Sequence, residues 1–390
     1  FKRNNVWWVK LAVPLSLRSE LGYDLRRTTG EKDLDKAIPI RDKIIEEFKT
    51  EFQIRKVNAD DKGIVLRGTE HMQKTDISDP QYFHKVVDCQ YACPAHTNVP
   101  EYIRLIAQKK YDDAYMLNWE SNVFPGILGR TCDRPCEPAC RRGRTHDKPV
   151  AICRLKRVTY DYKNDIDPYL PDIPKVKNGK KIGLIGAGPA SLTVARDLLP
   201  LGYEVTIFEK DNKPGGLMRT NIPSFRLPAE VLDEEVYRII KMGAELKTNS
   251  YIDSLEKVID SFDAVFVGTG APKGKDLEIP GRKEASENIH IGIDWLTSIA
   301  FEHTKSIGKK VIVIGGGNTA MDCCRTAIRL GADDVKVTVR SPKSDMKASD
   351  WELEEAIDEG IPILDNTSPK EFLLDDEGKL KGMKFEKMEA

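Results

Sequence analysis

The sequence predicts an α/β protein in which two doubly wound parallel sheets follow a helical, cysteine-bearing segment. Two glycine-rich loops, at 186–191 and 315–320, each lie between a short apolar run and a helix-like run. Strand and helix patterns alternate around both loops, which is the order that builds a parallel sheet. Six of the eight cysteines fall between positions 89 and 153, ahead of both loops.

The composition excludes several classes of partner. The 390 residues are 40% hydrophobic and 32% charged, with a net charge of −1. A charge so close to zero gives no global field to attract nucleic acid, so we expect no nucleic-acid partner. No apolar run approaches the roughly 18–20 residues that a membrane helix needs, so we expect no membrane span.

Residues 1–55 form a predicted accessory N-terminal module, and the polar residues 56–85 a linker. Val6–Val9 alternates like a short strand, and 16–21 and 35–52 read as helices. The pattern resembles the small N-terminal module of tyrosine recombinases, without any catalytic part. We interpret it as an extension for contacts within a complex. The alternative is DNA binding, which the neutral net charge disfavours.

Residues 86–170 are predicted to be helical, with helices over 100–107 and 111–120 and with cysteines in irregular loops. Thiolates at intervals of four residues suit iron–sulfur clusters better than structural zinc, which is usually held by closer cysteine pairs. Clustered cysteines beside nucleotide folds also favour a reducing, cytoplasmic compartment over a disulfide framework. The candidate metal ligands are Cys89, Cys93, Cys132, Cys136, Cys140 and Cys153.

The first glycine-rich loop has the order of a Rossmann-like dinucleotide-binding unit. Lys181–Ile185 and Glu204–Phe208 read as strands on either side of a helix. Gly186 lets the chain turn off the strand, and Gly188 lets a pyrophosphate approach the backbone at the helix N-terminus. Glu209 ends the next strand, where a carboxylate can accept hydrogen bonds from ribose hydroxyls.

Further along, the adjacent glycines Gly215 and Gly216 allow the backbone to lie against a flat ring. Arg226 has two open interpretations: it contacts a flavin or its phosphates, or it forms a surface ion pair. The candidate cofactor-binding residues of this first unit are Gly186, Gly188, Pro189, Ala190, Ser191, Glu209, Lys210, Gly216, Leu217, Arg226, Thr269 and Gly270.

The second glycine-rich loop repeats this geometry between strands predicted at 310–314 and 335–339. The second of these strands is followed by Arg340 rather than an acid. A guanidinium there can hold a 2′-phosphate, which favours NADP(H) over NAD(H). Alternatively, Arg340 is an exposed residue at a strand end. The candidate residues of this unit are Gly315, Gly317, Asn318, Thr319, Ala320, Arg340 and Lys343, with Lys347 adding charge nearby.

Together these motifs resemble the small (beta) subunit of NADPH-dependent glutamate synthase and the N-terminal half of dihydropyrimidine dehydrogenase. The likeness covers about residues 86–390 and includes Ile222–Pro228, 316–322 and 129–140. It implies FAD on a first domain at 178–285, NAD(P)H on a second at 286–390, and [4Fe-4S] clusters in the helical domain. It also implies that electrons leave through the clusters to a partner subunit or domain.

The sequence departs from this family in its cysteines. The family has a further cysteine pair ahead of the position of Cys89, so six cysteines stand where two complete clusters would need eight. The resemblance makes Cys93, Cys132 and Cys136 ligands of one cluster, with Cys153 as a candidate fourth ligand. Cys89 and Cys140 would belong to the other, incomplete cluster, replace Cys153, or bind a cluster that has an outside ligand.

The second departure concerns the ends of the chain. The family's returning flavin segment does not follow the strand-like run 381–388, so the FAD domain lacks its closing segment. We therefore expect the chain to be truncated at its C-terminus, and, because its first residue is Phe1 rather than methionine, at its N-terminus as well.

The sequence therefore predicts an NAD(P)H:acceptor oxidoreductase subunit that passes electrons through FAD and [4Fe-4S] to a partner. A glutamate synthase large subunit or another redox module would be the acceptor. The cofactors carry the chemistry, so we predict no catalytic side chain. One alternative is a cluster-poor diaphorase that reduces a soluble carrier, and another is a nucleotide-binding redox sensor or scaffold without turnover.

Overall fold

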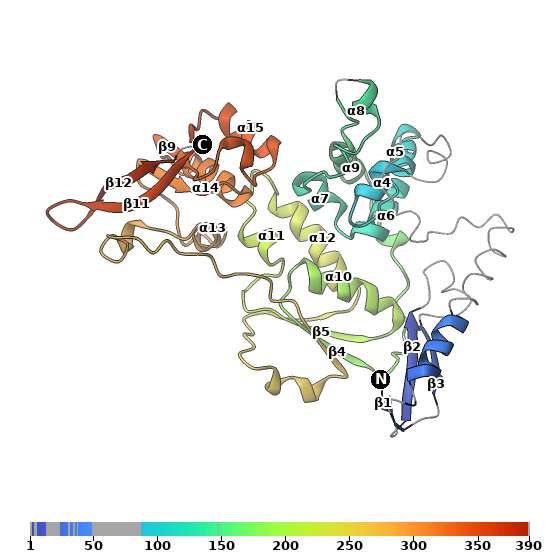
Figure 1. Cartoon of the computed structure of the whole chain (residues 1–390). Coiled ribbons are helices and arrows are strands. Elements are labelled where there is room, and N and C mark those ends of the chain that lie inside the picture. The colour runs from blue at the N-terminus through green and yellow to red at the C-terminus, as the bar shows by residue number, and fades with distance from the viewer. Residues whose placement is uncertain are drawn as a thin grey trace. The chain divides into compact units, whose positions relative to one another are not determined.

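The structure is a computed structural model of the chain (Figure 1). The residues that it describes are 2–3, 6–12, 24–29, 32–33, 36, 38–48, 87–146 and 148–388. The chain divides into two compact units, one made of residues 1–96 with 139–147, the other of 97–138 with 148–390. The finer domain division expected from the sequence remains a prediction.

The first unit contains a small antiparallel sheet in the order β1-β2-β3. The strand expected at Val6–Val9 lies within β2, whereas β3 was not expected, since its charged sequence does not alternate. The expected helix at 16–21 and the linker 56–85 lie outside the described residues. Of the helix expected at 35–52, residues 36 and 38–48 are described and are helical. The elements are β1 (Lys2–Arg3), β2 (Val6–Ala12), β3 (Asp24–Thr28), α4 (Asp88–Ala92) and α8 (Arg142–Thr145).

The second unit begins with helices, two of which match the helices expected at 100–107 and 111–120. The side chain of Asn98 caps the first of them by accepting a hydrogen bond from the Glu101 N–H, 3.3 Å away. The cysteine-bearing stretch 132–138 is irregular, as expected. The helices are α5 (Val99–Ala107), α6 (Tyr111–Asn122), α7 (Pro125–Thr131) and α9 (Ile152–Asp161).

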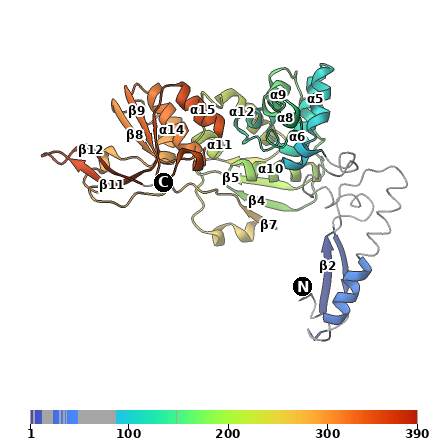
Figure 2. The ribbon, with the colours of Figure 1, turned by 45° about the horizontal axis from the view of Figure 1, so that its top comes forward.

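The first parallel sheet has the order β6-β5-β4-β7, and α10 and α12 lie along one of its faces (Figures 1 and 2). Its central strands β4 and β5 match the expected strands residue for residue. We call this sheet and its helices the first nucleotide fold. Its elements are β4 (Lys181–Ile185), α10 (Pro189–Leu198), β5 (Glu204–Phe208), α11 (Leu217–Thr220), α12 (Ala229–Lys241), β6 (Glu245–Lys247) and β7 (Ala264–Val267).

The second parallel sheet has the order β10-β9-β8, and an antiparallel hairpin of β11 and β12 follows it (Figure 1). We call this part the second nucleotide fold. Its elements are α13 (Gly292–Ala300), β8 (Lys310–Ile314), α14 (Asn318–Arg329), β9 (Asp334–Thr338), α15 (Asp350–Asp358), β10 (Ile363–Leu364), β11 (Thr367–Leu374) and β12 (Leu380–Lys387). Short 3-10 helices are η3 (Asp167–Tyr169), η4 (Leu199–Leu201), η5 (Leu255–Lys257), η6 (Ile259–Ser261), η7 (Ser286–Asn288) and η8 (Lys343–Asp345). Two parallel sheets behind a helical segment confirm the predicted fold class.

Two separate apolar cores lie among the described residues of the second unit. One joins Trp119 of α6 and Ile127 of α7 to Leu184 and Ile207 of the first sheet, so these helices pack on the first nucleotide fold. The other surrounds Met321 of α14 and includes Cys323 and Cys324, which are buried as the sequence indicated. Burial raises the pKa of both thiols to about 12.

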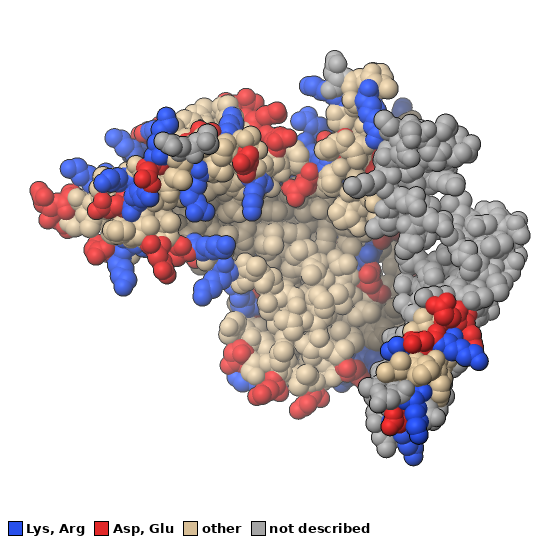
Figure 3. Space-filling view, viewed as in Figure 1, with Lys and Arg blue, Asp and Glu red and all other residues tan. Residues whose placement is uncertain are grey.

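Among the described residues, no helix combines the length and apolar character needed to cross a bilayer. On the face shown in Figure 3, basic and acidic side chains of these residues are interspersed. That distribution agrees with the near-zero net charge.

Candidate functional site

The first glycine-rich loop lies at the carboxyl ends of β4, β5 and β7, where ligands bind in parallel α/β sheets. Gly186 has φ +91°, and a Cβ there would lie 2.6 Å from the carbonyl oxygen of Gly268. Gly188 faces Gly216: a Cβ on Gly216 would lie 2.7 Å from the Gly188 Cα. Three segments thus approach backbone to backbone, and we call this arrangement the glycine cradle.

The third position of the loop is a packing residue, as the sequence indicated. Ser191 is completely buried on α10, and a Cβ on Gly268 would come within 2.2 Å of its Oγ. The Ser191 Oγ has no hydrogen-bond partner among the described residues. Only a small residue fits between this helix and the end of β7.

Glu209 is 4% exposed and lies beside the cradle. Its carboxylate accepts hydrogen bonds from the Ala187 N–H at 2.7 Å and the Asp211 N–H at 3.0 Å. These bonds hold the acid at the end of β5, and each carboxylate oxygen keeps a further lone pair for a ribose hydroxyl.

The other expected residues of the first site line its open rim. Thr269 and Gly270 follow β7 and are exposed, and Leu217 begins α11. Pro189 and Ala190 form the first turn of α10, and Lys210 follows Glu209 with its side chain 53% exposed.

Arg226 does not form the surface ion pair that was one of its two interpretations. Its side chain is 10% exposed and pairs with Asp322 and Glu352 of the second nucleotide fold. The sequence motif contained Asp322 without giving it a role. A contact of Arg226 with flavin remains a prediction.

The second loop lies at the carboxyl ends of β8 and β9. Gly315 has φ +144°, and its N–H donates to the Thr338 oxygen at 3.0 Å. Gly317 caps the N-terminus of α14, and nothing lies within 4 Å of the position that its Cβ would occupy. Ala320 packs in the first turn, 8% exposed. An open space thus adjoins backbone N–H groups at a helix N-terminus, which suits a phosphate.

Sequence reasoning missed two residues beside this loop. The Asn318 side chain accepts from the Ser349 N–H at 2.8 Å and donates to Asp133 at 3.4 Å. The Ser349 hydroxyl also donates to Asp133, at 3.2 Å. Asp133 follows Cys132, so the cysteine loop touches the N-terminus of α14; no sequence spacing indicates this contact.

The cations expected after β9 follow this strand, whose carboxyl end adjoins the second loop. Arg340, Lys343 and Lys347 are all exposed. Within the part of the chain that the structure describes, none of the three side chains forms an ion pair. Thr319 occupies the first turn of α14.

In the first unit, Cys140 is close enough to Cys89 to affect the pKa of its thiol. Burial raises the pKa of the Cys89 thiol, and Cys140 and Asp88 raise it further. Asp88 is held by Arg141 at 2.9 Å and Arg144 at 3.3 Å. Cys93 belongs to this unit as well.

In the second unit, Cys153 lies on α9 beside the end of α7. Its Sγ is 3.4 Å from the carbonyl oxygens of Leu128 and Gly129. Burial raises the pKa of the Cys153 thiol. The charge of Arg134 lowers this pKa, and the neighbouring Cys132 raises it. The Arg134 N–H donates to the Cys132 Sγ at 3.4 Å, the type of bond that iron–sulfur ligands accept.

Cys136 is buried in this second unit. In the described parts of the chain, no three His, Cys, Asp or Glu side chains already form a metal site. The expected group of Cys93, Cys132 and Cys136 joins residues of both units and remains a prediction. The thiol donors and the N–H bond to sulfur fit an iron–sulfur centre chemically.

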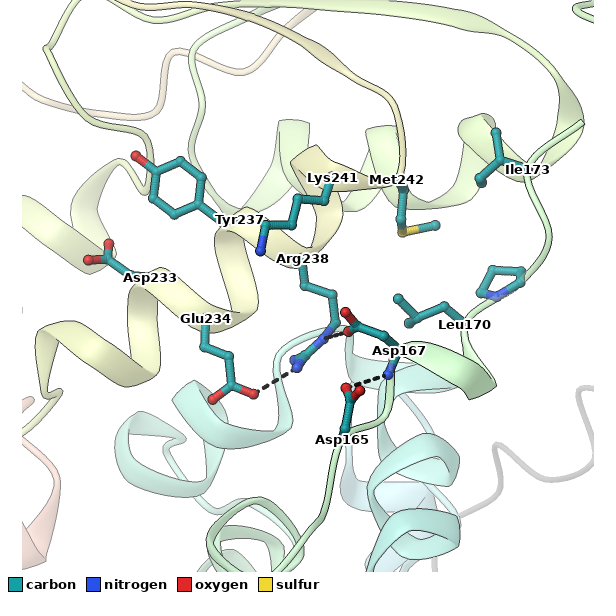
Figure 4. Close-up of a pocket in the computed structure, with 11 residues that line it drawn as sticks. Asp165, Asp167, Leu170, Ile173, Asp233, Glu234, Tyr237, Arg238, Lys241 and Met242 are labelled. Atoms are coloured by element: carbon teal, nitrogen blue, oxygen red, sulfur yellow. Dashed lines mark hydrogen bonds and ion pairs between the residues drawn. The ribbon is translucent and has the colours of Figure 1, made fainter. Parts of the chain in front are cut away.

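A cavity of about 400 Å³ lies between the segment 165–173 and α12 (Figure 4). Arg238 lines it and is neutralised by Glu234 at 2.7 Å and Asp167 at 3.3 Å. None of the residues expected from the sequence lines this cavity. The glycine-rich edges of the two sheets are therefore the candidate site.

Comparison with models of known protein families shows which family the chain belongs to. Residues 180–389 match the pyridine nucleotide-disulphide oxidoreductase model. The chain belongs to this family. Residues 82–167 match the model of dihydropyrimidine dehydrogenase domain II, 4Fe-4S cluster. The two models cover the two parts that the sequence had separated, a cysteine-bearing helical part and the paired nucleotide folds.

Three relatives are each 34% identical to the chain. The beta subunit of NADPH-Fe(3+) oxidoreductase from Geobacter sulfurreducens aligns with 83% of this chain and 51% of its own length. The small chain of NADPH glutamate synthase from Azospirillum brasilense aligns with 73% and 62%. A homologue of the NAD-dependent dihydropyrimidine dehydrogenase subunit PreT from Salmonella typhi aligns with 72% and 68%.

These relatives confirm the resemblance to glutamate synthase small subunits and dihydropyrimidine dehydrogenase. They are subunits of oxidoreductases, in agreement with the predicted enzyme class. The chain spans about half the length of the first of them.

Proposed function

We propose that the chain is an electron-entry module that takes a hydride from NADPH onto FAD and passes single electrons through an iron–sulfur centre to a partner. The observation that carries this proposal is the pairing of two glycine-rich sheet edges in one unit, one cradled by facing glycines and one open beside cations. Bound FAD would accept hydride from nicotinamide, and the iron–sulfur centre would carry single electrons onward.

The chain's own residues would divide the binding work. Gly186 and Gly188 bring the backbone to the FAD pyrophosphate, and Glu209 accepts the ribose hydroxyls. Gly317 and the first turn of α14 receive the NADPH pyrophosphate. Cys132 and Cys153, with Cys93 and Cys136, would hold one [4Fe-4S] cluster.

Cys89 and Cys140 stand apart as ligands of an incomplete second site or of a cluster with an outside ligand. Reducing cytoplasm is the proposed compartment, because thiolate ligands require it. The partner would be an acceptor subunit or domain; two relatives are named as a formate dehydrogenase subunit beta and a glutamate synthase small chain, which are themselves subunits.

Anaerobic titration tests the proposal. We expect NADPH to bleach the flavin and the broad iron–sulfur absorbance of the 390-residue protein loaded with FAD, iron and sulfide. Gly317→Ala should raise the Kd for NADPH about 10–200-fold, because its methyl enters space that the pyrophosphate needs. FAD content should not change, since the added Cβ meets no protein atom within 4 Å.

Gly382→Ala on β12 is the matched control, because its Cβ is equally free of neighbours and lies outside the site. A flavin that binds but is reduced by neither nucleotide would contradict the proposal. That result would favour the redox sensor or scaffold.

The choice of NADPH over NADH depends on Arg340. Arg340→Ser should raise the Kd for NADPH about 10–100-fold and leave that for NADH nearly unchanged, because only NADPH has the 2′-phosphate. Flavin-reduction titrations with both nucleotides measure this, and Lys381→Ser, an exposed cation on β12, is the control. An equal increase in the Kd values for NADPH and NADH would show that Arg340 does not recognise the 2′-phosphate.

A further inference from the structure

The two nucleotide folds are not joined by a common apolar core. The cluster around Leu184 and the cluster around Met321 have no residue in common among the described residues. Folds that meet without a large apolar interface move relative to each other by default. Hydride transfer, however, needs the reacting atoms about 3–3.5 Å apart. Polar contacts must therefore fix the orientation of the two folds.

Arg226 makes the most buried of these contacts. It lies in the loop that precedes α12 in the first fold. Its Nη1 is 2.6 Å and 2.7 Å from the two carboxylate oxygens of Asp322 on α14. Its Nη2 pairs with Glu352 on α15. The Asp322 and Glu352 side chains are 6% and 3% exposed, so a single guanidinium joins two helices of the second fold in the interior.

Arg325 extends this network within the second fold. Its guanidinium lies 3.3 Å from the Glu352 carboxylate and 2.6 Å from Glu355. One of the two carboxylates that Arg226 meets, that of Glu352, is thus also held by Arg325. Removal of Arg226 would take away one positive charge that balances the buried carboxylates of Asp322 and Glu352. A buried carboxylate without a balancing charge destabilises the folded protein strongly.

The residue before Arg226 adds an independent contact. The Phe225 ring lies under two guanidinium groups of α14: the Cζ of Arg329 is 3.9 Å from its centroid and that of Arg325 is 4.9 Å. In the same loop region, the Asn221 amide donates to the Ile293 oxygen at 3.1 Å. Residues 221–226 therefore reach three helices of the second fold.

We propose that Phe225 and Arg226 form a clamp that fixes the second nucleotide fold in the orientation for hydride transfer, with Arg226 as a positioning residue. This inference rests on the proposed function. In that step a hydride, two electrons with one proton, leaves the reduced nicotinamide and joins the flavin. The nicotinamide is oxidised, the flavin is reduced, and solvent supplies the second proton. The clamp forms no bond to either reactant.

Stopped-flow reduction of the FAD-loaded protein tests the clamp. For Arg226→Gln, we expect the limiting rate of flavin reduction at saturating NADPH to fall about 10–100-fold, since misplacement of about 1 Å has this effect. The Kd for NADPH should stay unchanged, and the FAD content is measured alongside because Arg226 is also a candidate flavin contact. Arg226→Lys should recover part of the rate, because it keeps the charge. Asp322→Asn should resemble Arg226→Gln, and the double variant should be no slower than either.

A second readout does not depend on activity. In cofactor-free protein, Arg226→Gln should speed amide hydrogen exchange in 222–228 and in the first turns of α14 and α15. Arg238→Gln is the matched control, because its side chain is 8% exposed and its acidic partners Glu234 and Asp167 both lie outside the second fold. It should leave the limiting rate and the exchange of α14 unchanged.

The outcomes separate the two proposals. A wild-type limiting rate in folded, FAD-loaded Arg226→Gln would overturn the clamp alone. Loss of FAD from this variant would also overturn it, by assigning Arg226 to the flavin site. Wild-type protein whose flavin neither nucleotide reduces would overturn the proposed function, and with it this role of the clamp.

Discussion

Replacement of Glu235 by alanine should lower the free energy of unfolding by about 3–5 kcal/mol at pH 6. Glu235 lies on α12 and is 2% exposed. Its carboxyl group accepts hydrogen bonds from the N–H groups of Gly126 at 2.7 Å and Ile127 at 2.9 Å, and from the Tyr115 hydroxyl at 2.8 Å. Alanine would leave three buried donors without an acceptor, and each costs about 1–3 kcal/mol.

This effect should depend on pH. Burial raises the pKa of Glu235 from 4.5 to about 7, against the hydrogen bonds that favour its charged form. Because the folded protein holds the proton more tightly than the unfolded chain, the stabilisation is complete below pH 4.5. It is lost as the pH rises through 7. Between pH 5 and 8 the loss is about 2–3 kcal/mol, so the gap between wild type and Glu235→Ala should narrow.

Urea denaturation followed by circular dichroism at pH 5, 6, 7 and 8 measures both effects. Glu230→Ala is the control, because Glu230 lies on the same helix and is exposed. It should change stability by about 0.5 kcal/mol or less. A Glu235→Ala variant within 1 kcal/mol of wild type at pH 6, or a gap that widens with pH, would contradict the argument.

The bonds of Glu235 also bear on the cysteines. Gly126 and Ile127 begin α7, and Cys132 follows its last residue. A single buried carboxyl group on the first nucleotide fold therefore anchors the helix that leads into a candidate cluster ligand. Loss of iron from Glu235→Ala would be explained by this anchor without any direct contact to a cysteine.

Helix α7 shows where prediction from the sequence fails. Glycine has low helix propensity, and α7 contains Gly126 and Gly129 in seven residues. A Cβ on Gly126 would lie 2.3 Å from the Tyr160 ring, and one on Gly129 would lie 2.7 Å from the Arg157 backbone. Close packing against α9 selects these glycines, and that contact is not visible in local spacing. The strands β4 and β8 were predictable because their apolar runs end directly at glycine loops.

Some residues of the candidate site could be predicted from the sequence, and others could not. Gly186, Gly188 and Glu209 could be placed from spacing, because the turn, the phosphate approach and the strand end follow one another within a single βαβ unit. The partner of Arg226 could not, because Asp322 lies 96 residues away in another fold. Spacing within one segment carries no information on a charge pair between two folds.

Alanine at either of the two facing glycines of the cradle, Gly188 or Gly216, should weaken FAD binding, but for different physical reasons. Gly188 caps α10 with φ −81°, and a Cβ there would lie 3.9 Å from the Gly216 Cα, an ordinary contact. Gly188→Ala should therefore keep the stability of the cofactor-free protein while its methyl fills the space of the pyrophosphate. We expect the Kd for FAD to rise about 10–200-fold.

Gly216→Ala should weaken FAD binding and also lower the stability of the cofactor-free protein. Gly216 has φ +52°, and its Cβ would lie 2.7 Å from the Gly188 Cα, so the backbone itself must move. The strained conformation costs about 1–3 kcal/mol, a cost that Gly188→Ala does not carry. FAD titration and thermal unfolding of cofactor-free protein distinguish the variants, with Gly382→Ala as the control for both. If Gly188→Ala bound FAD as tightly as wild type, the cradle would not be where the pyrophosphate lies.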